Sequence, residues 1–341
     1  MRGRGAKVLH CDFGQFPQKL QLATAIDGHG SQQSLLIDAD SRHSLDEFTA
    51  VWDRSQLGNK TIRSVKMGME EYIRAESRTF LDGLYYLMPK AFWMSPPPQV
   101  RAAEIKIRQK QIATRLGLRI PDSCVGNAGE LARALAERHE AMAVKSIYRT
   151  FVDYELTPWE KVKRFCYNVK NSKMLEEYRR TDRLMWDDLQ YRCRQMIFTQ
   201  KFGKDEAEIY LSAISACPVI LQEYIPKKLE LRITAVGQKL FPCAIYSQEA
   251  QGDGAVDYRS HEDEARHEAY KLPAAIEEKC LALLRELGLQ FGAIDMIVTP
   301  DDDYVFLEVN ASNSAFLWVQ ERTGMPIAEA IADLLISRKG L

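Results

Sequence analysis

Three oxygen-bearing side chains lie on two apolar segments near the C-terminal end of the sequence. Asp295 falls inside FGAIDMIVT, and Glu308 and Asn310 fall at the end of YVFLEVN. Both segments have the branched, apolar composition of buried strands, and the Pro-Asp pair between them suits a turn. We expect a hairpin on which the side chains at 308 and 310 share one face and meet Asp295.

This set of side chains predicts a site for a hard cation. Carboxylate and amide oxygens without His or Cys favour Mg²⁺, which takes a few protein oxygens together with phosphate oxygens. A single buried Asp would more simply be a hydrogen-bonded core acid, and Glu308 and Asn310 could cap a turn. Three such residues on one hairpin favour the metal site. The acids Asp301–Asp303 lie on the turn itself, where solvated acids are ordinary.

Composition and charge exclude several classes of protein. The chain has 341 residues, 46% of them hydrophobic, and a formal net charge of -1, so no overall field attracts nucleic acid or an anionic membrane. No apolar run reaches the roughly 18 residues of a membrane span, and no signal-peptide pattern follows the basic N-terminus. The seven cysteines are scattered without CxxC spacing, which favours reduced thiols and a cytoplasmic protein. HEDEA is not HExxH, so a zinc protease is disfavoured.

The first part of the chain predicts a small α/β domain followed by helices. Strands are expected at AKVLHCDF, SLLIDAD and FTAVWD, and the prolines Pro96–Pro98 indicate a stiff linker or a domain boundary. RAAEIKIRQKQIATRLGL has the periodicity of one amphipathic helix that ends at Gly117. NAGELARALAERHE predicts a helix capped by Asn127, with Glu130 three residues later, and AMAVKSI a short buried strand.

The second part begins with an unusually polar segment. Residues 159–194 interleave bases, acids and aromatic residues and predict mostly helix. CPVILQEYI predicts a strand, and ELRITAV and KLFPCAIYS predict a hairpin that turns near Gly237. A helix ending at Gly288 and a closing helix at IAEAIADLLIS complete an α/β (α+β) fold.

With these elements in order, Asp295 followed by Glu308-x-Asn310 resembles the metal-binding end of the ATP-grasp ligases. PVILQEYIPKKLELR resembles the hinge strand of that fold, and the resemblance covers roughly residues 95–341. It implies that the chain binds ATP and Mg²⁺. It also implies roles for individual residues. Leu307 would pack under the adenine, Glu230 would bind the ribose hydroxyls, Lys145 would reach the nucleotide and Lys106 its phosphates. The edge of the adenine would be contacted by Gln222, Glu223, Tyr224 and Ile225.

A narrower resemblance extends over almost the whole chain. QEYIPKKLELRITAVGQKLFPCAIYSQ, the DYR at 257–259, IFTQK, AVWDR and FLWVQERTGMPIAEAIADLL resemble the graspetide (microviridin-type) ligases, which form omega-ester or omega-amide macrocycles. This resemblance implies three parts. They are a small N-terminal α/β pre-ATP-grasp domain at 1–95, a central ATP-grasp sub-domain at 96–222 with a polar helical insertion at about 150–195, and a C-terminal sub-domain at 223–341 that carries the metal site.

The mechanism implied by the resemblance is that of an ADP-forming ligase. A carboxylate of a ribosomal precursor peptide, made of a leader and an acidic core, attacks the γ-phosphate of ATP and becomes an acyl phosphate. A Ser or Thr hydroxyl or a Lys amine then displaces phosphate. Arg232, on the strand face of Glu230, is the candidate for contact with the transferred phosphate. Arg259 is a second candidate for this contact, and the alternative interpretation is that it is an ordinary surface arginine.

Two features of the polar segment leave its role open. No glycine occurs between Gly129 and Gly203, where the resembling enzymes have a glycine-bearing loop over the phosphates, so Lys and Arg side chains would have to replace that cover. Residues 159–194 are equally consistent with a contact to the leader and with a solvated helical insertion. A nucleic-acid surface is less favoured because acids are interleaved with the bases.

Two other functions share most of the residues named above. The first is an ATP-grasp carboxylate–amine ligase that acts on free amino acids or small peptides. The second is a non-catalytic ATP-binding or peptide-binding module, which the presence of Asp295, Glu308, Asn310, Lys145 and Lys106 disfavours. The resemblance also implies a homodimer, and no membrane or nucleic-acid partner is expected.

Overall fold

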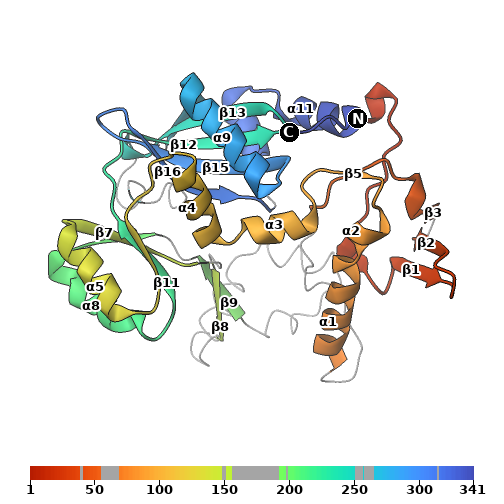
Figure 1. The fold of residues 1–341 in the computed structure, drawn as a ribbon, viewed down its shortest axis with the longest axis horizontal. Coiled ribbons are helices and arrows are strands. Elements are labelled where there is room, and N and C mark those ends of the chain that lie inside the picture. Colours follow the sequence, from red (N-terminus) through yellow and green to blue (C-terminus); the bar gives the residue numbers. More distant parts are fainter. Residues whose placement is uncertain are drawn as a thin grey trace, which may run out of the picture. The chain divides into compact units, whose positions relative to one another are not determined.

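The computed structural model describes residues 1–38, 41–54, 69–147, 151–155, 192–196, 199–249, 256, 265–312 and 315–341. The chain divides into two compact units (Figure 1). The first contains residues 1–121 and 225–341, and the second contains residues 122–224. The boundaries expected at residues 95 and 222 stay predictions, and each unit is described here by itself.

The N-terminal part of the first unit is a small α/β assembly. Its elements are η1 (Arg2–Arg4), η2 (Phe13–Gln15), β1 (Gln21–Ile26), β2 (Gln32–Ile37), β3 (Arg42–Ser44), η3 (Leu45–Glu47), β4 (Ala50–Val51), α1 (Met69–Asp82), α2 (Leu84–Leu87) and β5 (Phe92–Trp93). β1, β2 and β3 form an antiparallel sheet in that order, and β4 pairs with β5 in parallel. A core that includes Leu36, Leu45 and Trp93 joins β2, η3, α2 and β5.

The N-terminal elements differ from the sequence-based expectation at several points. The strand expected in AKVLHCDF is wrong, because residues 6–12 belong to neither a helix nor a strand. The apolar side chains of this segment, Leu9, Cys11 and Phe13, instead pack half-buried against the small core. Strands do occur within SLLIDAD and FTAVWD, whereas β1 and α1 were not predicted.

A five-stranded antiparallel sheet forms the centre of the first unit. Its strands, in spatial order, are β14 (Arg266–Ala269), β13 (Lys239–Tyr246), β12 (Leu229–Val236), β15 (Phe291–Val298) and β16 (Tyr304–Asn310). The hairpins expected near Gly237 and around Pro300 are confirmed, and Asp302 N donates to Thr299 O at 3.0 Å, as a turn with Pro300 in its second position requires. The short helix η6 (Ser247–Glu249) follows β13.

Helices cover both faces of this sheet. The helices of the unit that pack on it are α3 (Pro97–Ala103), α4 (Lys106–Arg115), α9 (Ala274–Leu287), α10 (Leu317–Thr323) and α11 (Ile327–Ser337). Ile112 of α4 and Leu283 of α9 share one core with Ile233 of β12. On the other face, α10 and α11 pack with β13 in a second core that also contains Met94. Both predicted helix ends are confirmed, since Gly288 ends α9 with φ 73° and α11 spans IAEAIADLLIS.

The structure corrects two expectations about residues 96–118. Pro96–Pro98 do not form a linker. Pro97 and Pro98 begin α3, where a proline costs no hydrogen bond because the first N–H groups of a helix have no helical partner. The single helix expected at 101–118 is two helices, which are interrupted between Ala103 and Lys106.

The described residues of the second unit form a four-stranded antiparallel sheet, two α-helices, one short 3₁₀ helix and a two-stranded ribbon. These elements are β6 (Ser123–Gly126), α5 (Gly129–Arg138), β7 (Ala141–Lys145), β8 (Phe151–Glu155), β9 (Arg192–Met196), β10 (Gln200–Gly203), η5 (Lys204–Glu206), α8 (Ala207–Ile214) and β11 (Val219–Glu223). The sheet order is β10-β7-β11-β6, and α5 and α8 share its core. Asn127 does not cap α5, because the cap position belongs to Ala128 and no side chain bonds there.

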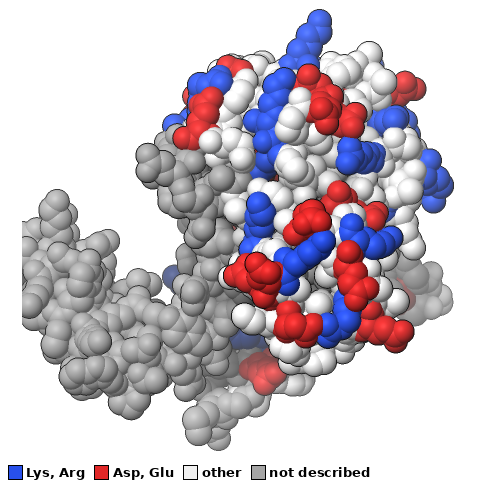
Figure 2. All heavy atoms as spheres, turned by 90° about the vertical axis from the view of Figure 1, so that its left-hand side faces the viewer, with Lys and Arg blue, Asp and Glu red and all other residues white. Residues whose placement is uncertain are grey.

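The ends of the polar segment are strands rather than helix. β8 and β9 pair as an antiparallel ribbon, which corrects the helical insertion expected at about 150–195 at both of its ends. Residues 156–191 lie outside the described residues. On the face shown in Figure 2, acidic and basic side chains stand next to one another over the described part of the chain. No helix among the described residues has the length and apolar character to cross a membrane.

Candidate metal and nucleotide site

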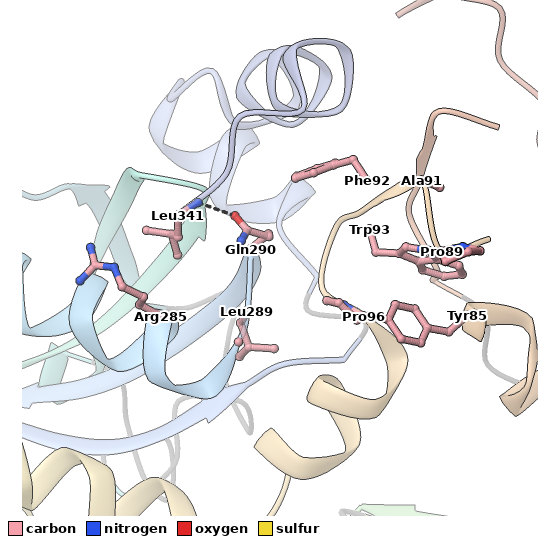
Figure 3. A pocket seen from close by; sticks show the side chains of 11 residues that line it. Tyr85, Pro89, Ala91, Phe92, Trp93, Pro96, Arg285, Leu289, Gln290 and Leu341 are labelled. Atoms are coloured by element: carbon pink, nitrogen blue, oxygen red, sulfur yellow. Dashed lines mark hydrogen bonds between the residues drawn. The ribbon is translucent and has the colours of Figure 1, made fainter. Parts of the chain in front are cut away.

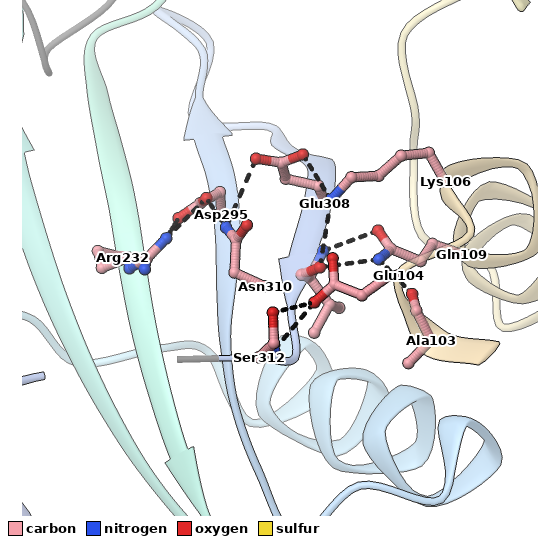
Figure 4. A network of polar contacts seen from close by, with 10 residues as sticks. Ala103, Glu104, Lys106, Gln109, Arg232, Asp295, Glu308, Asn310 and Ser312 are labelled. Carbon is pink, nitrogen blue, oxygen red and sulfur yellow. Dashed lines mark hydrogen bonds and ion pairs between the residues drawn. The ribbon is translucent and has the colours of Figure 1, made fainter. Parts of the chain in front are cut away.

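Three charged side chains lie in one row across neighbouring strands of the five-stranded sheet. The backbone register places Arg232 of β12 opposite Asp295 of β15, and Asp295 opposite Glu308 of β16. Nη1 of Arg232 lies 2.8 and 2.9 Å from the two carboxylate oxygens of Asp295 (Figure 4). Nδ2 of Asn310 donates to Asp295 at 2.7 Å and to Glu308 at 3.5 Å. The structure thus brings the three expected ligands together, and their role as ligands stays a prediction.

A β-bulge in β16 aims two consecutive residues at this site. Asp295 pairs with Glu308, whereas Met296 pairs with Phe306, so Leu307 is the extra residue on β16. Phe306 and Val309 both point into the core, although strict alternation would put them on opposite faces. Leu307 and Glu308 therefore both lie on the site face, as bulges beside functional sites often arrange.

The break between α3 and α4 places the ammonium group of a lysine beside this row. Lys106 is the first residue of α4, and its Nζ lies 2.9 Å from Glu308 Oε2 and 3.4 Å from Val309 O. The Lys106 side chain is 11% exposed and that of Glu308 30% exposed, so solvent screens this pair less than an exposed pair. The lysine predicted to contact phosphates therefore lies beside a predicted metal ligand.

The electrostatics of the row suit a divalent cation. Burial raises the pKa of the Asp295 carboxyl, and the negative charge of Glu308 adds to that rise, while Arg232 and Lys106 oppose it. A cation bound between the two carboxylates would relieve their repulsion. Rotation of the Asn310 amide by half a turn would offer its Oδ1 as a third oxygen ligand. Among the described residues, no group of three or more His, Cys, Asp or Glu side chains could hold a metal ion, and this site offers two carboxylates and one amide.

Next to the row lies a small apolar patch and a buried ion pair. Leu307 packs with Ile225, Ile297 and Val305, so two of the predicted adenine contacts are neighbours. Glu230, the predicted ribose ligand, accepts from Lys227 Nζ at 2.7 Å, with the two side chains 11% and 3% exposed. Lys227 also donates to Val256 O at 3.0 Å.

The remaining predicted nucleotide residues belong to the second unit. Gln222 and Glu223 end β11, and Lys145 ends the neighbouring strand β7. Tyr224 follows β11, its N–H bonded to Ala141 O at 3.0 Å and its ring 4.2 Å from Lys201 Nζ. Because the two strands are antiparallel, Lys145 lies opposite Ile220, at the other end of the pair from Glu223 and Tyr224. The contact of these residues with a nucleotide stays a prediction.

Sequence reasoning missed two buried polar residues of the first unit, Lys227 and Gln109. The i, i+3 spacing of Lys227 and Glu230 indicates an ion pair only on a helix, and these residues lie in a loop and a strand, so it gave no signal. Gln109 carried no signal either, because a polar residue on an amphipathic helix normally faces solvent. The predicted Arg259 and most of the segment 159–194 lie outside the described residues.

A separate cavity of about 300 Å³ lies elsewhere in the first unit (Figure 3). Tyr85, Phe92 and Trp93 line it together with Arg285 and Gln290. Oε1 of Gln290 accepts from Leu341 N at 2.7 Å. Within the described residues, its lining includes none of those predicted for the metal or the nucleotide.

Comparisons with known proteins agree with the fold that this geometry suggests. A family described as the MvdD pre-ATP grasp domain matches residues 1–101. One similar structure is a RiPP-associated ATP-grasp ligase of Chryseobacterium gregarium in complex with ADP and a leader and core peptide. It is 26% identical with a TM-score of 0.81, and the match covers 99% of this chain and 91% of that chain. The macrocyclase MdnC of Microcystis aeruginosa MRC, bound with the precursor peptide MdnA, is 28% identical with a TM-score of 0.78, covering 99% and 93%.

A third similar structure supports the fold alone. The macrocyclase MdnB of Microcystis aeruginosa MRC is 23% identical with a TM-score of 0.70, over 98% of this chain and 92% of its own. No curated protein sequence matches the chain.

Proposed function

We propose that this chain, an ATP-grasp ligase with an MvdD-type pre-ATP-grasp domain, uses ATP to join side chains of a ribosomal precursor peptide into macrocycles. Asp or Glu side chains would supply the carboxyl groups, and Ser or Thr hydroxyls or Lys amines would be the acceptors. The row of Arg232, Asp295 and Glu308 is the observation that carries this proposal. The likeness to two enzymes that were solved with precursor or leader and core peptides supports the peptide substrate.

Asp295, Glu308 and Asn310 would hold Mg²⁺, because the Asn310 amide lies against both carboxylates and would offer its Oδ1 as a third oxygen after rotation by half a turn. The ion would supply neutralisation of the negative charge that spreads over the phosphoryl oxygens. Arg232 orients Asp295 through two contacts and keeps its carboxylate on the site face. Lys106 holds Glu308 in the same way from the opposite side.

ATP would be the co-substrate, and its parts match different residues. Leu307 and Ile225, which pack together, would contact the face of the adenine. Gln222, Glu223 and Tyr224 would contact its edge, and Glu230 would accept from the ribose hydroxyls. Lys106, Lys145 and Arg232 would bind phosphate oxygens, for which a planar guanidinium is well suited.

The reaction would proceed in two displacements. A peptide carboxylate attacks the γ-phosphorus, the bond to the β,γ-bridging oxygen breaks, and an acyl phosphate and ADP form. A hydroxyl or amine of the same peptide then attacks the acyl carbon, loses its proton and expels phosphate. Arg232, with Arg259 as a second candidate, would stabilise the transferred group by charge and position.

The partner would be a precursor peptide with a leader and an acidic core. Residues 159–194 are either the leader contact or a solvated insertion. We also expect a cytoplasmic homodimer, which sedimentation of the purified chain would test against a monomer.

The decisive experiment is mass spectrometry of a reaction with ATP, Mg²⁺ and the small acidic peptide encoded beside the gene. The expected result is an ATP-dependent loss of one water mass for each ring. ADP release with free amino acids, and an unchanged peptide, would favour the carboxylate–amine ligase. No reaction with any of these substrates would favour the non-catalytic binding module.

A further inference from the structure

The side-chain amide of Gln109 is bonded to the backbone of the strand that carries the predicted metal ligands. Gln109 lies in α4 and is 1% exposed. Its Oε1 accepts from Val309 N at 2.9 Å, and its Nε2 donates to Val309 O at 2.7 Å (Figure 4). Nε2 also donates to Ala103 O at 2.6 Å. One side chain thus satisfies three buried backbone groups.

These bonds take the place of a missing neighbouring strand. β16 is the last strand of its sheet and pairs with β15 on one side. On its outer side, Phe306 N donates to Arg119 O at 2.8 Å, and Val309 exchanges both of its bonds with Gln109. A primary amide offers a donor and an acceptor side by side, as a peptide group does, so it can pair with an edge residue without a strand.

The residue that Gln109 fixes lies between two predicted ligands. Val309 separates Glu308 from Asn310, so its backbone orientation determines how both side chains project onto the site face. Lys106, three residues before Gln109 on the same helix, bonds to Glu308. α4 therefore holds both the backbone and the charge of this short segment.

The break between α3 and α4 makes this arrangement possible. Ala103 ends α3, and its carbonyl accepts from Gln109. Glu104, in the break, accepts from Ser312 N and Ser312 Oγ at 2.9 Å each, which holds the chain just after Asn310. A continuous helix through residues 104 and 105 would bond the Ala103 carbonyl within the helix.

We propose that Gln109 is a positioning residue that presents Glu308 and Asn310 in the geometry needed for divalent-cation binding. This inference rests on the proposed function, because it takes those two residues as metal ligands. Residues that orient metal ligands typically change metal affinity by about 10–100-fold when they are replaced. A residue that only stabilised the core would lower the melting temperature and leave cation affinity unchanged.

The test is calorimetric binding of ADP to the full chain, with Mg²⁺ and with EDTA. Gln109→Met keeps the length and loses all three bonds, and Gln111→Met replaces an exposed glutamine of the same helix as a matched control. We expect Gln109→Met to weaken Mg²⁺-dependent ADP binding by about 10-fold or more, with ADP binding in EDTA unchanged. Gln111→Met should bind like the unmodified chain.

The outcomes separate this inference from the proposed function. If ADP binds the unmodified chain no better with Mg²⁺ than with EDTA, the metal site itself is wrong. If Gln109→Met folds and its ADP affinity with Mg²⁺ stays within twofold of that of the unmodified chain, the positioning role is overturned. Should Gln109→Met not fold, Gln109→Glu, which keeps the acceptor for Val309 N, takes its place. Failure of both variants to fold would make Gln109 a folding residue and also overturn the proposal.

Discussion

The site concentrates charge at a few positions that are at least partly buried, and each charge has a counter-charge in contact. Asp295 contacts Arg232, and Glu308 contacts Lys106. These pairs hold the carboxylates in place before any ion or nucleotide binds. Preorganisation of this kind is effective because the groups need little reorganisation during reaction. The chemistry at the residue scale therefore depends on charge as much as on shape.

Replacement of Glu308 by Gln should abolish turnover and leave the fold intact. The amide keeps the shape of the side chain but removes the negative charge that attracts the cation. A bound cation contributes several kcal/mol to transition-state stabilisation. We expect ADP release to fall by roughly a thousandfold, equivalent to about 4 kcal/mol. Circular dichroism would confirm folding, and undiminished turnover in the folded variant would refute the metal-site assignment.

Two adjacent lysines offer a matched test of burial. Lys227 is paired with Glu230 in the interior, whereas Lys228 is paired with Asp302 at 2.7 Å with both side chains more than half exposed. Lys227→Met leaves a buried carboxylate without its partner and should lower the free energy of unfolding by about 3 kcal/mol. Lys228→Met should lower it by less than about 1 kcal/mol. Equal losses in urea titrations would contradict this distinction.

The sequence predicted the ligands better than the residues that position them. Asp295, Glu308 and Asn310 stand out because polar residues are rare on apolar strands. Gln109 and Lys227 lie where polar residues look ordinary, one on an amphipathic helix and one in a lysine-rich loop. Their burial is a consequence of tertiary packing, which the local pattern does not contain.

At the scale of elements, two irregularities build the site, and neither was predictable. YVFLEVN has the pattern of a regular strand, and the bulge at Leu307 appears only in its pairing with β15. RAAEIKIRQKQIATRLGL keeps helical periodicity across the break at Glu104. The break is stabilised by hydrogen bonds to Val309 and Ser312, which lie 200 or more residues further along the chain. The break depends on partners distant in the sequence, whereas the bulge depends on pairing with the neighbouring strand of the same hairpin. Regular elements were predictable because their signal is local, as with α9 and α11.

The segment that leads into α3 is tied to β15 by one serine. Ser95 is 5% exposed, and its Oγ accepts from Gln290 N at 3.0 Å and Phe291 N at 2.9 Å. Ser95→Ala leaves these N–H groups without that acceptor and should lower the free energy of unfolding by about 2 kcal/mol. Ser337→Ala, at an exposed serine, is the control and should change it by less than about 0.5 kcal/mol. Similar urea midpoints for the two variants would show that Ser95 is not an anchor.

At the scale of the whole chain, the order of the motifs was more informative than any single motif. The ATP-grasp resemblance rested on several weak signals in sequence order, and the structural comparisons confirmed it. The N-terminal part was harder to predict, because its core is small and draws on loop side chains such as Leu9. A fold can thus be recognised from ordered site residues while its peripheral domain is only outlined.

The acids of the site also link cation binding to global stability. Burial raises the pKa of Asp295, so its charge opposes folding until a cation compensates it. ADP with Mg²⁺ should therefore raise the melting temperature, by the equivalent of about 2.7 kcal/mol when the ligand exceeds its Kd a hundredfold. ADP with EDTA should give a clearly smaller increase.

Asp295→Asn should remove the Mg²⁺-dependent part of this stabilisation, because the amide lacks the charge that holds the cation. Asp301→Asn changes an exposed acid on the turn of the same hairpin and should keep the full effect, since that acid lies in solvent. Differential scanning fluorimetry on both variants, with and without EDTA, would measure the difference. A Mg²⁺-dependent shift that survives in Asp295→Asn would place the cation elsewhere, because a ligand stabilises the folded chain only through the site that binds it.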